Sequence, residues 1–127
     1  YGRIVNIIST SVKQPIPGLG VSNTIRGAVA SWSKTLATEL GAFGITVNNV
    51  LPGYTKTSRL DSLMQSRSEA TGKSMEEIEK MFMYDIPLKR IGTAEEFGAA
   101  VAFLCSPAAG YINGINLPVD GGRLQTL

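Results

Sequence analysis

Hydrophobic and polar positions divide the chain into three strand-like runs and several helical stretches. β-Branched and other apolar residues dominate the segments 3–9, 45–51 and 115–120. The first run, after Gly2, is typical of a strand that is buried on both faces, as in a parallel sheet, and the other two runs are also predicted to be strands. Pro118 has no backbone N–H to donate to a neighbouring strand, so the third run is predicted to lie at an edge of the sheet.

The longest helical pattern covers residues 22–40. Its apolar positions recur with the spacing of a helix and are Ile25, Ala28, Val29, Trp32, Leu36 and Leu40. Gly41 and Gly44 follow, and glycine is the residue that most often ends a helix. A long amphipathic helix is therefore predicted between the first two strands.

The segment 54–90 differs from the rest because it is polar, mixed in charge and rich in methionine. Three apolar residues at helical spacing indicate one short helix in it: Leu60, Leu63 and Met64. Ser74 with Glu77, and Thr93 with Glu96, have the spacing of a capping box, in which a hydroxyl and a carboxylate cap the first turn together. Two further helices are predicted to begin at these positions.

The order strand, helix, strand, helical insertion, helix, strand predicts an α/β fold. Parallel strands joined through helices need right-handed crossover connections. A doubly wound sheet is built from two such halves, and its phosphate-binding glycine loop follows the first strand. No G-x-G-x-x-G follows a strand here. We therefore expect residues 1–127 to form half of a Rossmann-like doubly wound parallel sheet, with three parallel strands and their helices, incomplete on its own.

Composition narrows the classes of function. Hydrophobic residues make up 43% and charged residues 17% of the chain, which supports a buried core and argues against disorder. Twelve Lys and Arg against ten Asp and Glu leave a net charge of +2, too small for a dedicated nucleic-acid or anionic-membrane binder. No apolar run approaches the roughly 18 residues of a membrane span. Neither nucleic acid nor a membrane is therefore expected as a partner.

The chain has no histidine and one cysteine, Cys105. Without histidine the chain itself cannot supply a Ser-His-Asp triad, a Cys-His dyad or a histidine-ligated zinc site, and no metal site is expected. A single cysteine excludes an internal disulfide framework and fits a reducing compartment, so we expect a cytoplasmic location. The chain opens on Tyr1 without a signal-peptide pattern or a methionine, which indicates a truncated, processed or partial polypeptide.

Four stretches stand in a specific order and spacing. They are Gly2-Arg-Ile-Val-Asn-Ile-Ile-Ser9, Leu36-Ala-Thr-Glu-Leu40, Gly44-Ile-Thr-Val-Asn-Asn-Val-Leu-Pro-Gly53 and Tyr111-Ile-Asn-Gly-Ile-Asn-Leu-Pro-Val-Asp-Gly-Gly122. Together they resemble the short-chain dehydrogenases/reductases, especially the ketoacyl-reductase-like members. The resemblance covers nearly the whole chain but only the C-terminal half of a family member. It implies hydride transfer between NAD or NADP and an alcohol or carbonyl substrate.

The family's chemistry uses a serine after a strand, a tyrosine that gives or takes a proton, and a lysine four residues beyond the tyrosine. The resemblance assigns the serine to Ser9. The tyrosine and lysine positions fall on Ser22 and Arg26, so the expected Tyr-x-x-x-Lys is replaced by Ser22-Asn-Thr-Ile-Arg26. This is the main departure from the family.

Positions 22 and 26 still share one face of a helix. A tyrosine titrates near about 10, whereas an aliphatic hydroxyl is a far weaker acid. Arg26 stays cationic and could hold a ribose, a phosphate or a carboxylate. Losing a well-placed general acid costs about 10²–10⁴ in rate. The alternative is structural, with Ser22 as the N-cap of the long helix and Arg26 as a solvated residue.

The loop after the second strand resembles the family's segment that grips the nicotinamide carboxamide. Its matching residues are Pro52, Gly53, Thr55 and Thr57. Glycine would let the backbone approach closely, while the alternative is an ordinary Pro-Gly turn. Tyr54 in this loop, or a water held by Ser9 and Arg26, is a hypothetical replacement for the missing proton donor.

By the same resemblance, residues 54–90 correspond to a substrate lid. The lid's apolar side chains would form an adaptable wall against an apolar or bulky substrate, or would simply pack against the body of the protein. They are Met64, Met75, Met81, Phe82 and Met83. The long helix presents a second apolar side that pairs with its twin in relatives, which implies a homodimer or homotetramer.

Three functions remain open from the sequence. The first is an atypical NAD(P)-dependent oxidoreductase, supported by the ordered motifs and Ser9. The second is a nucleotide-binding protein that has lost catalysis, supported by Ser22 and Arg26. The third is an assembly or folding unit that binds no dinucleotide by itself.

Overall fold

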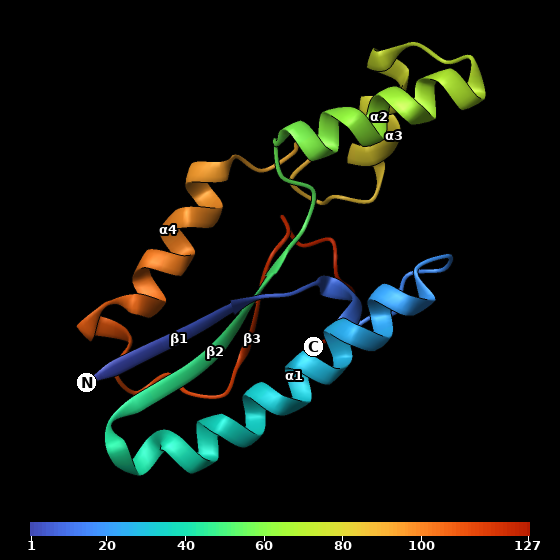
Figure 1. Ribbon diagram of the computed structural model, residues 1–127. Helices are drawn as coiled ribbons and strands as arrows, with labels where there is room; N and C mark the ends of the chain where they lie inside the picture. Colours follow the sequence, from blue (N-terminus) through green and yellow to red (C-terminus); the bar gives the residue numbers. More distant parts are fainter.

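A computed structural model describes residues 1–127 and contains one sheet of three parallel strands. The strands are β1 (Gly2–Ile7), β2 (Ile45–Pro52) and β3 (Asn116–Val119), and β2 lies between the other two (Figure 1). The predicted α/β class, with three parallel strands, is confirmed. β3 pairs with β2 alone, so Pro118 stands in an edge strand as predicted.

Two helices cover opposite faces of the sheet (Figure 1). The long helix α1 (Gly20–Leu40) packs on β2, and α4 (Ala94–Cys105) packs on β1 and β2 from the other side. Short 3₁₀ turns, η1 (Thr10–Val12), η2 (Gly41–Phe43) and η3 (Pro107–Ala109), connect these elements. Helices therefore cover both faces of the sheet, and β2 is buried while β1 and β3 are mostly half-buried.

The start of α1 differs from the prediction. The helix begins at Gly20 with Leu19 as its N-cap residue, and no side chain caps it. Asn23 Nδ2 donates to the carbonyl oxygen of Ile16 at 3.0 Å and so ties the preceding loop to the first turn. Ser22 therefore lies inside the helix, and its interpretation as the N-cap is wrong.

The core follows β2, whose residues 46–51 are all buried. Toward α4, Val50 packs with Leu104 and Ala109, each of them fully buried. Toward α1, Val47 and Leu51 are equally buried. Burying side chains of this size contributes about 1.5–3 kcal/mol each, so β2 and its two helices form the most stable part of the chain.

A row of asparagine side chains crosses the sheet on the side that α1 covers. Asn6 stands opposite Asn49, and Asn49 stands opposite Asn116. Asn6 Nδ2 donates to Asn49 Oδ1 at 3.2 Å and to Ser33 Oγ of α1 at 2.9 Å. Asn49 Nδ2 donates to Asn116 Oδ1 at 2.8 Å. Because a slip of one residue would turn an amide to the other face, this row fixes the register of all three strands.

Residues between β2 and α4 form a helical pair beyond the carboxyl end of β2 (Figure 1). The helices are α2 (Ser58–Thr71) and α3 (Met75–Tyr84), and they enclose a small core of Leu60, Met64, Ile78 and Ile91. Both predicted capping boxes, at the starts of α3 and α4, are present.

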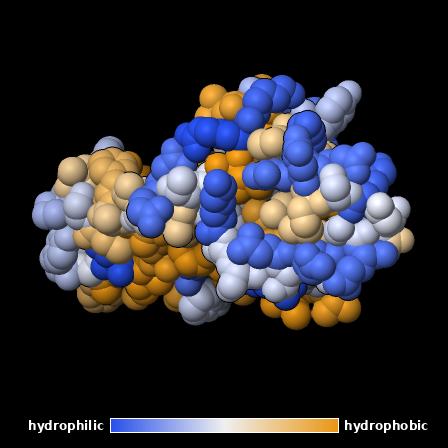
Figure 2. All heavy atoms as spheres, turned by 90° about the horizontal axis from the view of Figure 1, so that it is seen from above, coloured by the Kyte–Doolittle hydropathy of each residue, from blue (hydrophilic) through white to orange (hydrophobic).

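Apolar side chains also reach the surface. Figure 2 shows hydrophobic atoms gathered in exposed patches among hydrophilic ones on one face of the molecule. Fifteen large hydrophobic residues of the chain are exposed. The free edge of β1 presents backbone groups without a strand partner. None of the helices combines the length and apolar character that crossing a bilayer requires.

Candidate functional site

A groove of about 560 Å³ lies where β1 and β2 end and the helical pair begins. Ser9 follows β1, Pro52 ends β2 and Gly53 comes next, and all three line this groove. In open parallel sheets, ligands bind at the carboxyl ends of the strands. The structure thus brings together three of the residues that the sequence predicted.

Ser9 lies two residues beyond the end of β1, whereas the sequence predicted it as the last residue of the strand. It is half-buried and is the N-cap of η1, where its Oγ accepts a hydrogen bond from the backbone N–H of Ser11 at 3.1 Å. The hydroxyl proton has no acceptor within the chain. Ser9 can therefore cap the turn and still donate a hydrogen bond to an oxygen in the groove.

Position 53 requires a glycine because the residue after β3 lies too close to it for a side chain to fit. The N–H of Gly53 donates to the carbonyl oxygen of Val119 at 2.9 Å. A Cβ on Gly53 would lie 2.6 Å from the Cα of Asp120. The close approach predicted for this residue is thus made to the end of β3, which holds the loop rigidly at the rim of the groove.

The two threonines of the loop lie outside the groove that contains Ser9. Thr57 is the N-cap of α2, and its Oγ1 accepts from the backbone N–H of Leu60 at 3.3 Å. Thr55 Oγ1 donates to the carbonyl oxygen of Gly53 at 3.4 Å. Both have local structural partners, and their assignment to the cofactor stays a prediction.

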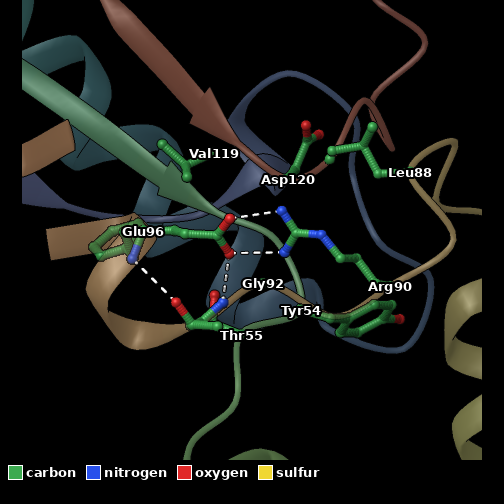
Figure 3. A pocket seen from close by; sticks show the side chains of 11 residues that line it. Tyr54, Thr55, Leu88, Arg90, Gly92, Glu96, Val119 and Asp120 are labelled. Carbon is green, nitrogen blue, oxygen red and sulfur yellow. Dashed lines mark hydrogen bonds and ion pairs between the residues drawn. The ribbon is translucent and has the colours of Figure 1, made fainter. Parts of the chain in front are cut away.

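Thr55 lines a second, smaller pocket of about 130 Å³ (Figure 3). There the Arg90 guanidinium faces the Glu96 carboxylate and donates two hydrogen bonds to it, at 2.8 and 2.6 Å. These two bonds, together with the hydrogen bond from the backbone N–H of Thr93, lower the pKa of Glu96 to about 2. The ion pair joins the end of the helical insertion to the first turn of α4. The positive charge of Arg90 and the negative charge of Glu96 neutralise each other there.

Ser22 and Arg26 lie on the exposed side of α1, in a shallow groove separate from the one that contains Ser9. Arg26 Nη1 donates to the carbonyl oxygen of Ile7, the last residue of β1, at 3.3 Å. Ser22 forms no side-chain hydrogen bond. The helix therefore brings Arg26, but not Ser22, into contact with the strand that precedes Ser9.

Tyr54 lines the same groove as Ser9. Its ring packs edge-on against Phe82 with centroids 4.7 Å apart. The Arg123 guanidinium lies 4.7 Å from the centre of the Tyr54 ring on its face. This aromatic and cationic stack joins the loop after β2, the helix α3 and the tail after β3.

Three charged residues of the groove were missed by the sequence reasoning: Arg67, Asp85 and Arg123. They come from α2, from the end of α3 and from the tail. No motif marks them. The predicted methionine wall is present in part, because Met81 and Phe82 line the groove while Met64 is buried between α2 and α3.

Comparisons with known proteins agree with this fold. Residues 1–123 match the family model described as enoyl-(acyl carrier protein) reductase. The chain is 32% identical over 127 residues to the NADPH-dependent reductase BacG of Bacillus subtilis, covering 100% of this chain and 49% of that protein. It is 38% identical over 125 residues to the short-chain reductase NovJ of Streptomyces niveus, covering 97% and 45%. The chain spans about half the length of the curated relatives it matches.

Two solved structures are also similar. The NADPH-dependent reductase YwfH of bacilysin biosynthesis matches with a TM-score of 0.93 and 31% identity, over 100% of this chain and 48% of that one. The L-sorbose reductase of Gluconobacter frateurii, complexed with NADPH and L-sorbose, matches with a TM-score of 0.92 and 31% identity, over 99% and 48%. With its sheet, its crossover helices and the groove beside Ser9, the chain belongs to the short-chain dehydrogenase/reductase family.

Proposed function

We propose that this chain forms the substrate-binding half of an NAD(P)-dependent oxidoreductase that acts on an alcohol or carbonyl substrate. The observation that carries the proposal is the groove at the carboxyl ends of β1 and β2, into which Ser9 offers an unused hydroxyl proton. Relatives described as NADPH-dependent reductases support the cofactor. When bound, the nicotinamide supplies or accepts the hydride.

Ser9 is proposed to donate a hydrogen bond to the substrate oxygen. A donor that is fixed before the reaction stabilises the negative charge that develops on a carbonyl oxygen as it is reduced. The bond from the Ser11 N–H keeps Ser9 Oγ in place. Gly53, held by Val119, lines the same groove.

Arg26 is proposed to hold the cofactor rather than to transfer a proton. A guanidinium stays charged at all relevant pH values and offers several N–H donors in a fixed plane. One of these binds Ile7, which leaves the others free for a ribose hydroxyl or a phosphate. Ser22, one turn earlier and without a partner, would lie beside the same group. Pro52, Gly53, Thr55 and Thr57 are proposed to bind the nicotinamide end.

Tyr54 is our candidate for the proton donor. It is a phenol in the same groove as Ser9, with a ring held by Phe82 and Arg123. The alternative is a water between Ser9 and Arg26. A second candidate function, a nucleotide-binding protein without catalysis, is favoured by the exposed and unpartnered Ser22 at the position where the family has its tyrosine.

Two measurements on the complete protein that carries this chain separate these functions. Titration of nicotinamide fluorescence measures dinucleotide binding, and oxidation of NADPH with a panel of carbonyl compounds measures hydride transfer. Binding together with transfer supports the oxidoreductase, and binding without transfer supports the second candidate. No binding would contradict both and leave the chain as an assembly unit.

The exposed face of α1 is proposed to pair with a second copy of the chain in a homodimer or homotetramer. Val21, Ile25 and Trp32 follow one another along this face and are each more than half exposed. Val21 and Ile25 also line the shallow groove that contains Ser22 and Arg26. An apolar stripe of this kind is typical of a helix that packs against another helix.

A further inference from the structure

We infer that the groove beside Ser9 takes a substrate that carries an anionic group, of which a keto acid is the simplest example, and that Arg123 and Arg67 hold this anion. The inference rests on the proposed function. It adds to it a substrate class and two specificity-determining residues, neither of which belongs to the motifs of the family resemblance.

Arg123 is held firmly in the tail after β3. Gly121 and Gly122 have φ angles of 66° and 85°, in the left-handed region, and turn the chain back toward the groove. The Asp120 carboxylate fixes this turn, because Oδ1 accepts from the N–H of Gly122 at 2.9 Å and Oδ2 from the N–H of Leu124 at 2.8 Å. The guanidinium is thus oriented before any ligand binds, and orientation of this kind reduces the entropy that binding costs.

The Arg123 guanidinium has no anionic partner within the chain. Its Nε is buried and forms no hydrogen bond. Buried polar groups without a partner are rare and destabilising, and they are often completed by a ligand or water. Arg90 differs in this respect, because its guanidinium donates two hydrogen bonds to the Glu96 carboxylate. The stack on the Tyr54 ring leaves the edge of the guanidinium, with its N–H groups, available.

The other charged groups of the groove favour an anion as well. Arg67 of α2 lines it and forms no ion pair, and Asp85 at the end of α3 is its one carboxylate. Two guanidinium groups against one carboxylate leave an excess of positive charge. Asp85 and Arg123 both also line the neighbouring pocket of about 220 Å³, whereas Arg67 lines only the groove.

The remaining wall fits a carbon chain between the two polar ends. Leu63, Met81 and Phe82 line the groove together with Ser9 and Arg123. A substrate with its carbonyl at Ser9, an apolar middle and a terminal carboxylate would therefore match Ser9, the apolar side chains and the two arginines of this wall. A guanidinium binds a carboxylate through two parallel hydrogen bonds, which gives specificity as well as affinity.

The test uses the complete protein, NADPH and a series of keto acids of increasing chain length, each paired with its uncharged methyl ester. The measured quantity is the ratio of kcat/KM for the acid to kcat/KM for the ester. We expect the wild-type protein to prefer at least one acid roughly 10- to 100-fold, the range of a hydrogen bond to a charged group. An acid-to-ester ratio near one throughout the series would overturn the inference.

Arg123→Gln is expected to abolish this preference, through a rise in KM for the acid, and Arg67→Gln to reduce it. Arg123→Lys, which keeps the charge but loses the planar fork, is expected to give an intermediate ratio. Arg59→Gln removes the same charge from α2 at an exposed residue that does not line the groove, and it is expected to keep the wild-type ratio. Because the ratio is taken within each variant, a general loss of folded protein does not change it. A preference that survives in both Arg123→Gln and Arg67→Gln contradicts the inference.

Three further results separate the inference from its premises. If no compound of the wider carbonyl panel is reduced, the proposed function fails, whereas if other carbonyl compounds are reduced but neither keto acids nor their esters are, only the inference fails. If esters are reduced and acids are not preferred, the oxidoreductase stands and the anion site fails.

The alternative source of the anion is a phosphate of the cofactor instead of the substrate. In that case Arg123→Gln would raise the KM for NADPH equally with acid and ester, and this result would also overturn the assignment.

Discussion

Arg26 Nη1 donates a hydrogen bond to the carbonyl oxygen of Ile7 at 3.3 Å, which joins the first turns of α1 to the end of β1. Ser9 follows Ile7 by two residues, so a permanent cation is anchored beside the strand that positions the proposed substrate contact. A lysine at this position would carry the same charge on a more compact ammonium and would lack the planar set of N–H donors that a guanidinium offers. The proposed departure from the family at positions 22 and 26 would therefore change the proton donor and the shape of the cation near Ser9.

The first prediction restores the family's pair. Ser22→Tyr combined with Arg26→Lys is expected to raise kcat, because it adds a phenol at the family's proton-donor position. In a Tyr54→Phe background, which removes the donor that we propose, the same pair is expected to raise kcat by up to about 10²–10⁴. The measurement is the steady-state rate of NADPH oxidation with a reducible carbonyl compound. Arg26→Lys alone is the control and is expected to give no gain. An unchanged rate in the double variant would contradict the alignment of the pair.

The second prediction concerns Tyr54. Tyr54→Phe keeps the ring that packs against Phe82 and lies under Arg123, and it removes only the hydroxyl. If Tyr54 is the proton donor, kcat falls by about 10²–10⁴ and KM changes little. The same kinetic assay measures both constants. Undiminished turnover eliminates Tyr54 and leaves a water between Ser9 and Arg26 as the source of the proton.

The third prediction concerns the row of amides across the sheet. Asn49→Leu removes the donor to Asn116 Oδ1 and leaves that oxygen without a partner, so it is expected to cost about 1–3 kcal/mol in the free energy of unfolding. Urea denaturation of the complete protein measures this change. Adding Asn116→Leu removes the orphaned oxygen, so the double variant is expected to be more stable than the sum of the single effects. Simple additivity would show that the bond contributes nothing.

Local spacing predicted much of the fold correctly. Ser74 with Glu77 marks the start of α3 because both capping partners lie within one turn, and Pro118 marks the edge strand because its missing N–H is a property of the residue itself. The start of α1 could not be found in this way, since Leu19 does not cap it and the loop is held by the distant contact from Asn23 to Ile16.

The candidate site was predicted less completely than the fold. Ser9 was assigned through the resemblance to the family, and the strong sequence pattern of the first strand placed it at the end of that strand. Arg123 reaches the groove only through the left-handed turn at Gly121 and Gly122, and nothing in its neighbourhood in the sequence indicates where that turn leads. Thr57 was assigned to a ligand, whereas its position before α2 gives it a helix to cap.

The fourth prediction is a pH dependence at Glu96. Its pKa is lowered from 4.5 to about 2, first by Arg90 and then by the N–H of Thr93. A carboxyl whose pKa is lower in the folded protein stabilises the fold above its unfolded pKa, and this stabilisation is lost as the pH falls through the folded value. Glu96→Gln keeps the cap but loses the charge, so its Tm is expected to lie below that of the wild type near neutral pH. The two melting curves should converge between about pH 4.5 and pH 2, and a difference in Tm that is constant over this range would contradict the assignment.

The fifth prediction concerns the exposed face of α1. Trp32 is 54% exposed and lies in line with Val21 and Ile25, so Trp32→Glu would bring a charge into any interface that this face forms. Buried aromatic residues of this kind commonly contribute 2 kcal/mol or more to an interface, which corresponds to a rise of about 30-fold or more in the dissociation constant. Sedimentation velocity of the complete protein at several concentrations measures the shift from oligomer to monomer. Phe103→Glu, at a comparably exposed apolar position on α4, is the matched control and is expected to leave that equilibrium unchanged. If both variants dissociate alike, or neither does, α1 is not the face through which the copies pair.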